Sequence, residues 1–194
     1  MISFFVLLHT LTTIAVIDSS EYSGSSIKSV SPTYVQAQQL FYESVNDKDK
    51  IDPAIALFEQ IQETEPALVG RAQTYIGTLI ALKGKHAFMP YNKYKWVIKG
   101  LEIMDQGVAA DPDDVESLFI HSSTCYYLPF FFNRGEDAQQ KFRQILELLP
   151  DQFNKYNASM LLNVLDFIEN NGQLNANEIG NLQEIRNKIK AQIK

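Results

Sequence analysis

Apolar side chains recur every three or four residues along most of the chain from residue 33 onward, with polar side chains between them. This spacing places the apolar residues on one face of an α-helix. The C-terminal segment shows it well, since the apolar residues of one face are Ile179, Leu182, Ile185, Ile189 and Ile193, and lysines lie on the other face. The pattern predicts helices at residues 33–47, 52–64, 68–84, 92–110, 113–128, 135–148, 151–170 and 175–193, and therefore an all-α fold.

Residues that favour helix ends stand at several of these boundaries. Ser31 can cap the first helix, because a serine side chain accepts hydrogen bonds from exposed backbone amides. Asp52 can cap a helix whose first residue is Pro53, a position where proline is tolerated. Asn175 with Glu178 has the spacing of a capping box at the start of the last helix.

One pattern occurs three times: a small residue, a large apolar residue four positions later, and a proline twelve positions after the small residue. The three sets are Ala54, Phe58 and Pro66; Gly100, Met104 and Pro112; and Ala138, Phe142 and Pro150. A small residue lets two helices approach closely, the large residue fills the space between units, and proline ends a helix. Repeated units of this kind stack, because one unit cannot bury its own apolar face. The alternative is an ordinary helical bundle in which the prolines recur by chance.

The spacing resembles the A-x3-F and proline positions of the tetratricopeptide repeat (TPR), a helix-turn-helix unit. The resemblance extends over residues 34–170, and in the first helices only Gly77 matches the family's helix–helix contact. It implies an α-α superhelix, that is, a TPR-like solenoid of antiparallel helix pairs, with a C-terminal capping helix. The implied units are residues 34–67, 68–112, 113–150 and 151–194. The implied function is a noncatalytic protein–protein interaction scaffold.

The chain is acidic overall, with 17 Lys and Arg against 23 Asp and Glu and a net charge of −6. The charges are mixed along the helices, so the basic face that binds nucleic acid is not predicted. The single cysteine, Cys125, cannot form an internal disulfide. The histidines, His9, His86 and His121, are scattered without the spacing of a metal site. No metal, cofactor or catalytic residue is therefore expected, and the chain is not predicted to be an enzyme.

Residues 1–17 form an apolar run, and serines dominate residues 18–33. We interpret the run as a signal peptide, which implies a secreted or periplasmic protein, although no basic residue precedes Lys28. The alternatives are an N-terminal membrane anchor, for which the run is shorter than the usual span of about 20 residues, and a buried helix. Residues 18–33 are predicted to be a flexible linker, and residues 34–194 the helical domain. Membrane association is therefore expected only through residues 1–17.

The repeat spacing exceeds the family unit of about 34 residues in two places. The prolines are 46 residues apart between Pro66 and Pro112, and 38 apart between Pro112 and Pro150. The excess falls in residues 84–91 and 126–134, two segments rich in aromatic residues and proline. Because equivalent loops of a solenoid emerge on the same edge, we expect these two inserted loops to lie side by side.

Aromatic side chains and arginine are enriched in binding hot spots, and loops often carry function. We therefore predict a protein or peptide partner, and no nucleic acid, for a surface that carries His86, Tyr91, Trp96, Phe130, Phe131 and Arg134. Arg71 and Asn46 would contribute from the concave face, which the first helices of the units line in this family. In the other interpretation, most aromatic residues of the loops close the core. A second class of function is a small-ligand-binding protein or an enzyme, with a pocket between the inserted loops near His86 and with Glu116 or Glu136 as its acid–base partner.

Overall fold

The computed structural model describes residues 31–192, so the predictions for residues 1–17 and for most of the serine-rich linker lie outside the described residues. Within this range the chain forms eight α-helices, four short 3-10 helices and no strand. The α-helices are α2 (Pro32–Ser44), α3 (Ile51–Thr64), α4 (Val69–His86), α5 (Pro90–Ala110), α6 (Val115–Tyr127), α7 (Gly135–Gln152), α8 (Ala158–Asn171) and α9 (Ala176–Gln192). The 3-10 helices are η2 (Lys48–Lys50), η3 (Pro66–Leu68), η4 (Phe130–Phe132) and η5 (Phe153–Lys155). The prediction of an all-helical protein is confirmed for this part of the chain.

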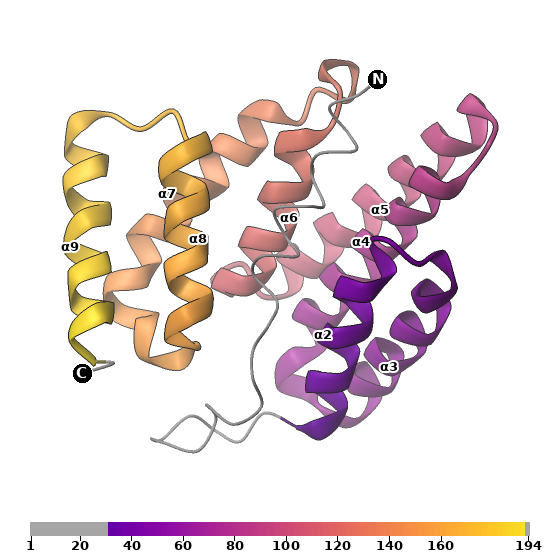
Figure 1. Cartoon of the computed structure of the whole chain (residues 1–194), viewed down its shortest axis with the longest axis horizontal. Coiled ribbons are helices and arrows are strands. Elements are labelled where there is room, and N and C mark those ends of the chain that lie inside the picture. The colour runs from indigo at the N-terminus through magenta and orange to yellow at the C-terminus, as the bar shows by residue number, and fades with distance from the viewer. Residues whose placement is uncertain (1–30, 193–194) are drawn as a thin grey trace.

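Successive helices pack as pairs, α2 with α3, α4 with α5, α6 with α7 and α8 with α9. In Figure 1 the pairs follow one another across the molecule, from the indigo α2 at the lower right to the yellow α9 at the left. The first helices of neighbouring pairs also touch, because α4 contacts both α2 and α6. The ring of Phe119 on α6 meets that of Phe167 on α8 at 5.4 Å, which connects the last two pairs.

Several helix ends form as the sequence predicts. The Ser31 side chain accepts a hydrogen bond from the backbone amide of Tyr34 and caps α2. At α9, the Asn175 side chain accepts from the amide of Glu178, while the Glu178 carboxylate accepts from the amide of Asn175. This reciprocal pair is the capping box that the sequence predicts.

Other predicted boundaries are wrong. α3 begins at Ile51, so Asp52 lies inside its first turn and is not its cap. Pro150 does not end α7, which continues to Gln152. Proline has no backbone N–H to donate to the carbonyl oxygen of Leu146, four residues earlier, and the Asn181 side chain of α9 donates to that oxygen at 3.3 Å instead. The helix predicted to begin at residue 151 begins at Ala158 instead, because η5 and the Asn157 cap intervene.

The small and the large residues of the repeated pattern occupy the core, whereas its prolines do not. Ala54, Phe58, Met104, Ala138 and Phe142 all have an exposed fraction of 0%. The small residues stand where neighbouring helices cross, and the large residues fill the space between them. The spacing of small and large residues therefore indicates core positions, and this holds whether or not the helix pairs belong to the TPR family.

Glycines at heptad spacing bring α4 and α5 into backbone contact. Gly70, Gly77 and Gly84 recur every seven residues on α4, and Gly100 and Gly107 do so on α5. A Cβ added to Gly107 would come 2.7 Å from the carbonyl oxygen of Gly70, closer than real Cβ atoms approach. Only glycine permits this separation, so the α4–α5 hairpin is held together by close packing over its full length.

The first of the two expected insertions is not a long loop. α4 runs to His86 and α5 begins at Pro90, so only residues 87–89 connect them. The extra residues lengthen both helices, and the α4–α5 hairpin therefore projects beyond its neighbours (Figure 1). The second insertion, between Tyr127 and Gly135, is a true connection that contains η4. In it, Asn133 adopts a left-handed backbone conformation with φ 53°, which asparagine tolerates and which turns the chain into α7.

The last helix packs against α7 and α8 with one apolar face. Leu182, Ile185 and Ile189 are buried there, while Lys188 and Lys190 are exposed. The prediction is wrong for Ile179 in the first turn of α9, which is 43% exposed. The outer face of α9 is polar, as expected for a helix that covers the end of a helical array. The predicted lysine face of this helix is therefore a solvated surface.

Candidate functional site

Six large apolar side chains stand exposed on the connections after α4 and α6 and on the first turns of α5. Their exposed fractions are 94% for Phe88, 54% for Met89, 72% for Tyr91, 50% for Tyr94, 93% for Phe130 and 61% for Phe131. The described part of the chain exposes one further large apolar residue, Ile179 of α9. We call the six residues the aromatic edge. Exposed apolar side chains that cluster in this way mark binding surfaces more often than isolated ones do.

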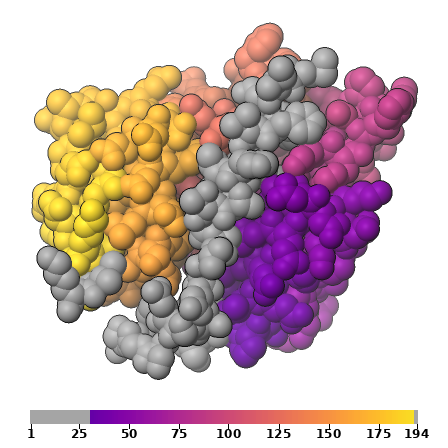
Figure 2. Space-filling view, in the orientation of Figure 1, coloured from indigo at the N-terminus to yellow at the C-terminus, as the bar shows by residue number. Residues whose placement is uncertain are grey.

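A ring contact joins the two halves of the aromatic edge. The ring of Tyr94 stacks on that of Phe132, with centroids 5.5 Å apart and planes inclined by 20°. Phe132 also packs against Phe131, at 4.7 Å between centroids, and against the core. Figures 1 and 2 show both connections projecting at the upper margin of the molecule. The two segments therefore present their aromatic residues at the same end of the fold.

The interpretation of these rings as core residues is wrong for Phe130 and Phe131, because both are exposed. It holds in part for Phe132, which is half-buried. η4 is only three residues long and points its first two rings away from the helices. Three consecutive phenylalanines predict burial, because the residues are strongly apolar. In the single turn of η4, however, only the ring of Phe132 reaches the core.

Trp96 lies two residues beyond Tyr94 and is half-buried. The ammonium nitrogen of Lys83 lies 5.4 Å from the ring of Trp96, and that of Lys99 lies 5.9 Å from it. Such cation–π contacts fix the indole on the side of the hairpin. Trp96 is therefore held between two lysines of the hairpin, and its direct contact with a partner stays a prediction.

His86 is exposed at the end of α4, and Asn46 is exposed in the turn after α2. Partial burial, together with the nearby charges of Lys85 and Lys48, lowers the pKa of His86. Of the two acid–base partners predicted for His86, Glu116 is engaged elsewhere, because its carboxylate accepts hydrogen bonds from other residues in the core. Glu136 is exposed in the first turn of α7.

Arg134 is not the free contact residue that the sequence predicts. Its guanidinium forms two hydrogen bonds with Asp105, one of them 2.9 Å from Nη1 to Oδ2. It also pairs with Asp137, at 2.7 Å between Nη2 and Oδ2. These bonds join α5 to the start of α7 directly behind η4. Arg134 therefore positions the second half of the aromatic edge.

Arg71 is likewise held inside the protein. Its Nε donates to Asp114 at 3.0 Å, and its Nη1 lies 3.1 Å from Glu116 Oε2. Glu116 also accepts from the phenol of Tyr34 at 2.6 Å and from that of Tyr75. Burial, reinforced by the charge of Glu116, raises the pKa of both phenols, so they remain proton donors. This network ties α2, α4 and α6 together and leaves Arg71 little capacity for a partner.

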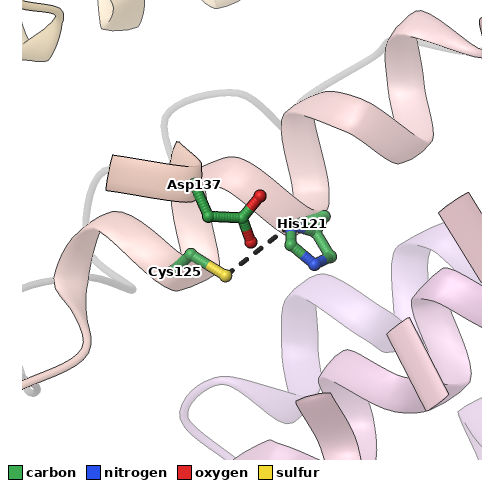
Figure 3. A group of neighbouring side chains, drawn as sticks. All are labelled: His121, Cys125 and Asp137. Carbon is green, nitrogen blue, oxygen red and sulfur yellow. Dashed lines mark hydrogen bonds between the residues drawn. The ribbon is translucent and has the colours of Figure 1, made fainter. Parts of the chain in front are cut away.

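A second polar cluster lies between α6 and α7. Figure 3 shows His121 and Cys125 on one helix and Asp137 on the next, with their side chains pointing toward one another. The ligand-type atoms of the three residues all lie within 4.8 Å of one another, and Cys125 Sγ is 3.6 Å from His121 Nδ1. The prediction that the histidines lack metal-site spacing overlooked this pair, since His121 and Cys125 are four positions apart and share one helix face.

The charges around this cluster argue against a metal ion. Arg134 and Lys141 both pair with Asp137, so its carboxylate is already neutralised by two cations. The His121 Nε2 lies 2.7 Å from the Asp105 carboxylate and 3.0 Å from Arg134 Nη2, so this nitrogen is already engaged, and Nδ1 faces Cys125. A divalent cation would have to displace these partners and lie beside two positive charges.

Cys125 is also a poor nucleophile. Burial raises the pKa of its thiol to about 12, and its exposed fraction is 1%. The thiolate is the reactive form of cysteine, and a buried thiol with a raised pKa does not supply it. Cys125 contacts His121, and His121 contacts Asp105, as nucleophile, base and acid do in a catalytic triad. Because Cys125 and His121 are buried, these contacts stabilise the packing of the helices and do not present a nucleophile to a substrate.

No family model matches the chain, and neither a curated protein nor a solved structure matches it. Within residues 31–192, no helix combines the length and the apolar character that crossing a membrane requires.

Proposed function

We propose that this protein is a noncatalytic interaction scaffold of TPR-like type that binds a protein or peptide partner through the aromatic edge. The observation that carries the proposal is the concentration of exposed rings on two adjacent connections, with Phe88 and Phe130 almost fully solvated. Exposed aromatic residues present large contact areas at low conformational cost. Water hydrates exposed aromatic rings unfavourably, and a partner that covers the rings removes this cost.

The scaffold beneath the aromatic edge favours a fixed recognition surface. The glycine contacts make α4 and α5 a closely packed hairpin, and Arg134 anchors the segment after η4 to α5. The stack between Tyr94 and Phe132 connects the two supports. A surface held in this way loses little conformational entropy when it binds.

The helix pairs and the three-fold pattern of small, large and proline residues support the TPR-like part of the proposal. The pairs α2–α3, α4–α5 and α6–α7 each contain one copy of the pattern in their second helix. Export, as a secreted or periplasmic protein, is proposed on the apolar sequence of residues 1–17 alone, with membrane anchoring through the same residues as the alternative.

Site-specific photo-crosslinking tests the proposed surface. The photoreactive amino acid p-benzoylphenylalanine, a close analogue of phenylalanine, replaces Phe88 or Phe130 in the full chain expressed in its native host. The same residue at Ile179 is the matched control, because that side chain is also exposed, at 43%, but lies on α9. We expect one shared adduct from positions 88 and 130 and none from position 179.

Two results would contradict the proposal. An adduct from position 179 that equals those from positions 88 and 130 would show nonspecific contact. The absence of any adduct at positions 88 and 130, in protein whose circular dichroism is unchanged, would exclude the aromatic edge as the binding surface.

A further inference from the structure

The region that carries the first half of the aromatic edge differs in charge from the rest of the protein. Residues 66–101 contain no aspartate and no glutamate, although the whole chain has 23 acidic residues and a net charge of −6. The basic residues in this range are Arg71, Lys83, Lys85, Lys93, Lys95 and Lys99. The acidic character of the chain is therefore confined to other segments, and the α4–α5 hairpin has a basic end.

Two of these lysines share an exposed face with the aromatic edge. Tyr91, Lys95 and Lys99 follow one another at intervals of four on α5, and all three are exposed. Residues four apart on a helix lie on the same side, so the lysines extend the apolar surface with positive charge. Lys95 pairs with no carboxylate in the part of the chain that the structure describes.

The other cations near the aromatic edge are already engaged. Lys83 pairs with Asp52 at 2.6 Å, and Lys85 donates to the backbone carbonyl of Val45 at 2.6 Å. Arg134, beside the second half, is held by Asp105 and Asp137. Lys95 and Lys99 are exposed and pair with no carboxylate within residues 31–192, although Lys99 also lies 5.9 Å from the Trp96 ring, so these two lysines concentrate positive charge on α5. The start of this helix adds to it, since Met89 makes no side-chain capping bond and the positive end of the helix dipole lies there.

We propose that the partner of the aromatic edge is an acidic peptide segment with at least one large apolar anchor, which contacts the phenylalanines while its carboxylates lie along Lys95 and Lys99. The inference rests on the proposed function and adds the chemistry of the ligand. Opposite charges orient an approaching partner, while apolar burial supplies most of the affinity. Since the remainder of the protein is acidic, an acidic ligand is repelled elsewhere and directed to this end.

Selection from a random library identifies the preferred chemistry without knowledge of the natural partner. The full chain, immobilised, is exposed to a phage-displayed library of random dodecapeptides at low ionic strength. We expect the selected pool to be enriched in Asp and Glu and in Phe, Trp or Leu. The dissociation constant of the tightest peptide is then measured for four proteins: unaltered, Phe88→Ser/Phe130→Ser, Lys95→Glu/Lys99→Glu, and Lys188→Glu/Lys190→Glu. The last variant makes the same charge change on α9 and is the matched control.

We expect the Lys95→Glu/Lys99→Glu variant to bind about tenfold more weakly, and the α9 control to bind as the unaltered protein does. Binding to the unaltered protein should weaken as salt is added, because exposed charges are screened. The exchanged residues are exposed, so we expect folding to persist, and circular dichroism with an unfolding midpoint checks it for each variant.

The outcomes separate the two proposals. If the peptides require Phe88 and Phe130 but are not acidic and bind the Lys95→Glu/Lys99→Glu variant equally well, the inference is overturned while the proposed function stands. If no selected peptide depends on Phe88 and Phe130, the proposed function itself fails. A third assay uses vesicles of phosphatidylcholine with phosphatidylglycerol. If the vesicles bind through the phenylalanines and lysines and no peptide is selected, the ligand is a lipid surface and the inference is overturned.

Discussion

Gly77 and Gly100 face each other across the α4–α5 hairpin so closely that neither could carry a side chain without movement. A Cβ added to Gly77 would lie 2.7 Å from the carbonyl oxygen of Gly100, and a Cβ added to Gly100 would lie 2.5 Å from that of Gly77. Because the obstacle is backbone, it cannot be relieved by a change of rotamer. The hairpin that carries the first half of the aromatic edge therefore depends on these two residues.

We expect Gly77→Ala to lower the free energy of unfolding by about 1–3 kcal/mol, because the added methyl group forces the helices apart. Gly180→Ala is the control, since Gly180 lies inside α9 and no atom stands within 4 Å of an added Cβ. That change should stabilise the protein by about 0.5–1 kcal/mol through helix propensity. Urea unfolding measures both. Equal effects of the two changes would contradict the close contact.

Phe142 of α7 and Phe130 of η4 differ completely in burial, so their substitution distinguishes a core position from a surface position. Phe142 has an exposed fraction of 0% and Phe130 one of 93%. We expect Phe142→Ala to cost about 3–5 kcal/mol of stability, because it leaves a cavity in the core. Phe130→Ala should change stability by less than about 0.5 kcal/mol. A large loss of stability in the Phe130 variant would mean that the ring is buried and would remove it from the aromatic edge.

The ion pairs of Arg71 are buried, so their loss is costly. We expect Arg71→Met to destabilise the protein by about 3–5 kcal/mol, since Asp114 and Glu116 would remain as buried charges without their partner. Lys50→Met, which removes an exposed pair with Glu43, should cost no more than about 1 kcal/mol. Thermal unfolding compares the two. If the Arg71 variant kept its stability, the network would not be what joins α2, α4 and α6.

Stability should depend on pH through His121. Burial lowers its pKa, although the hydrogen bond with Asp105 opposes this shift. In the unfolded chain the imidazole takes up a proton as the pH falls below about 6.5, whereas the folded protein takes it up only at lower pH. The unfolded state therefore binds more protons in this interval, and the free energy of unfolding decreases as the pH falls through it.

We expect this decrease to be smaller in a His121→Gln variant, measured as the change in the urea midpoint between pH 7.5 and 5.5. His86→Gln is the control, because that residue is exposed and its contribution is screened. The pKa of Asp105 is held well below its ordinary value by hydrogen bonds from His121 and Arg134, which outweigh burial. Its titration affects stability only at more acidic pH. An unaltered pH dependence in the His121 variant would contradict the buried neutral imidazole.

Much of the local structure was accessible from the sequence. The helix count, the capping box at Asn175 and Glu178, and the buried positions of Ala54 and Phe142 all follow from spacing and residue type. The ends of helices were harder to predict where a helix-breaking residue lies within an apolar, helix-favouring pattern. Pro150 predicts a helix end, but α7 continues past it because its last turn keeps its packing against the core.

The candidate site was accessible only in outline. The sequence indicates that two segments rich in aromatic residues carry the binding surface, and it offers Arg134 and Arg71 as contacts. It does not reveal that Asp105 and Asp137 hold the first arginine, or that Asp114 and Glu116 hold the second. Asp105, Asp114 and Glu116 lie between 29 and 45 residues from the arginine that each one holds, and no local pattern links them. Asp137 stands three residues after Arg134, so this pair alone has a local spacing. The heptad glycines of α4 and α5 are a signal of close packing that can be seen in the sequence, but the repeat pattern includes only Gly77 and Gly100 of these five residues.

The amino-acid sequence alone predicts that the described chain is helical, where most of its helices lie to within a few residues, and many of the positions that form the core. These properties depend on interactions between residues a few positions apart, which periodicity records directly. The packing of the helices sets which aromatic residues are exposed, which charges are neutralised and that Tyr94 meets Phe132. Exposure and charge pairing depend on neighbours that are distant in the chain, and the burial of a side chain is a property of the packed helices rather than of the residue.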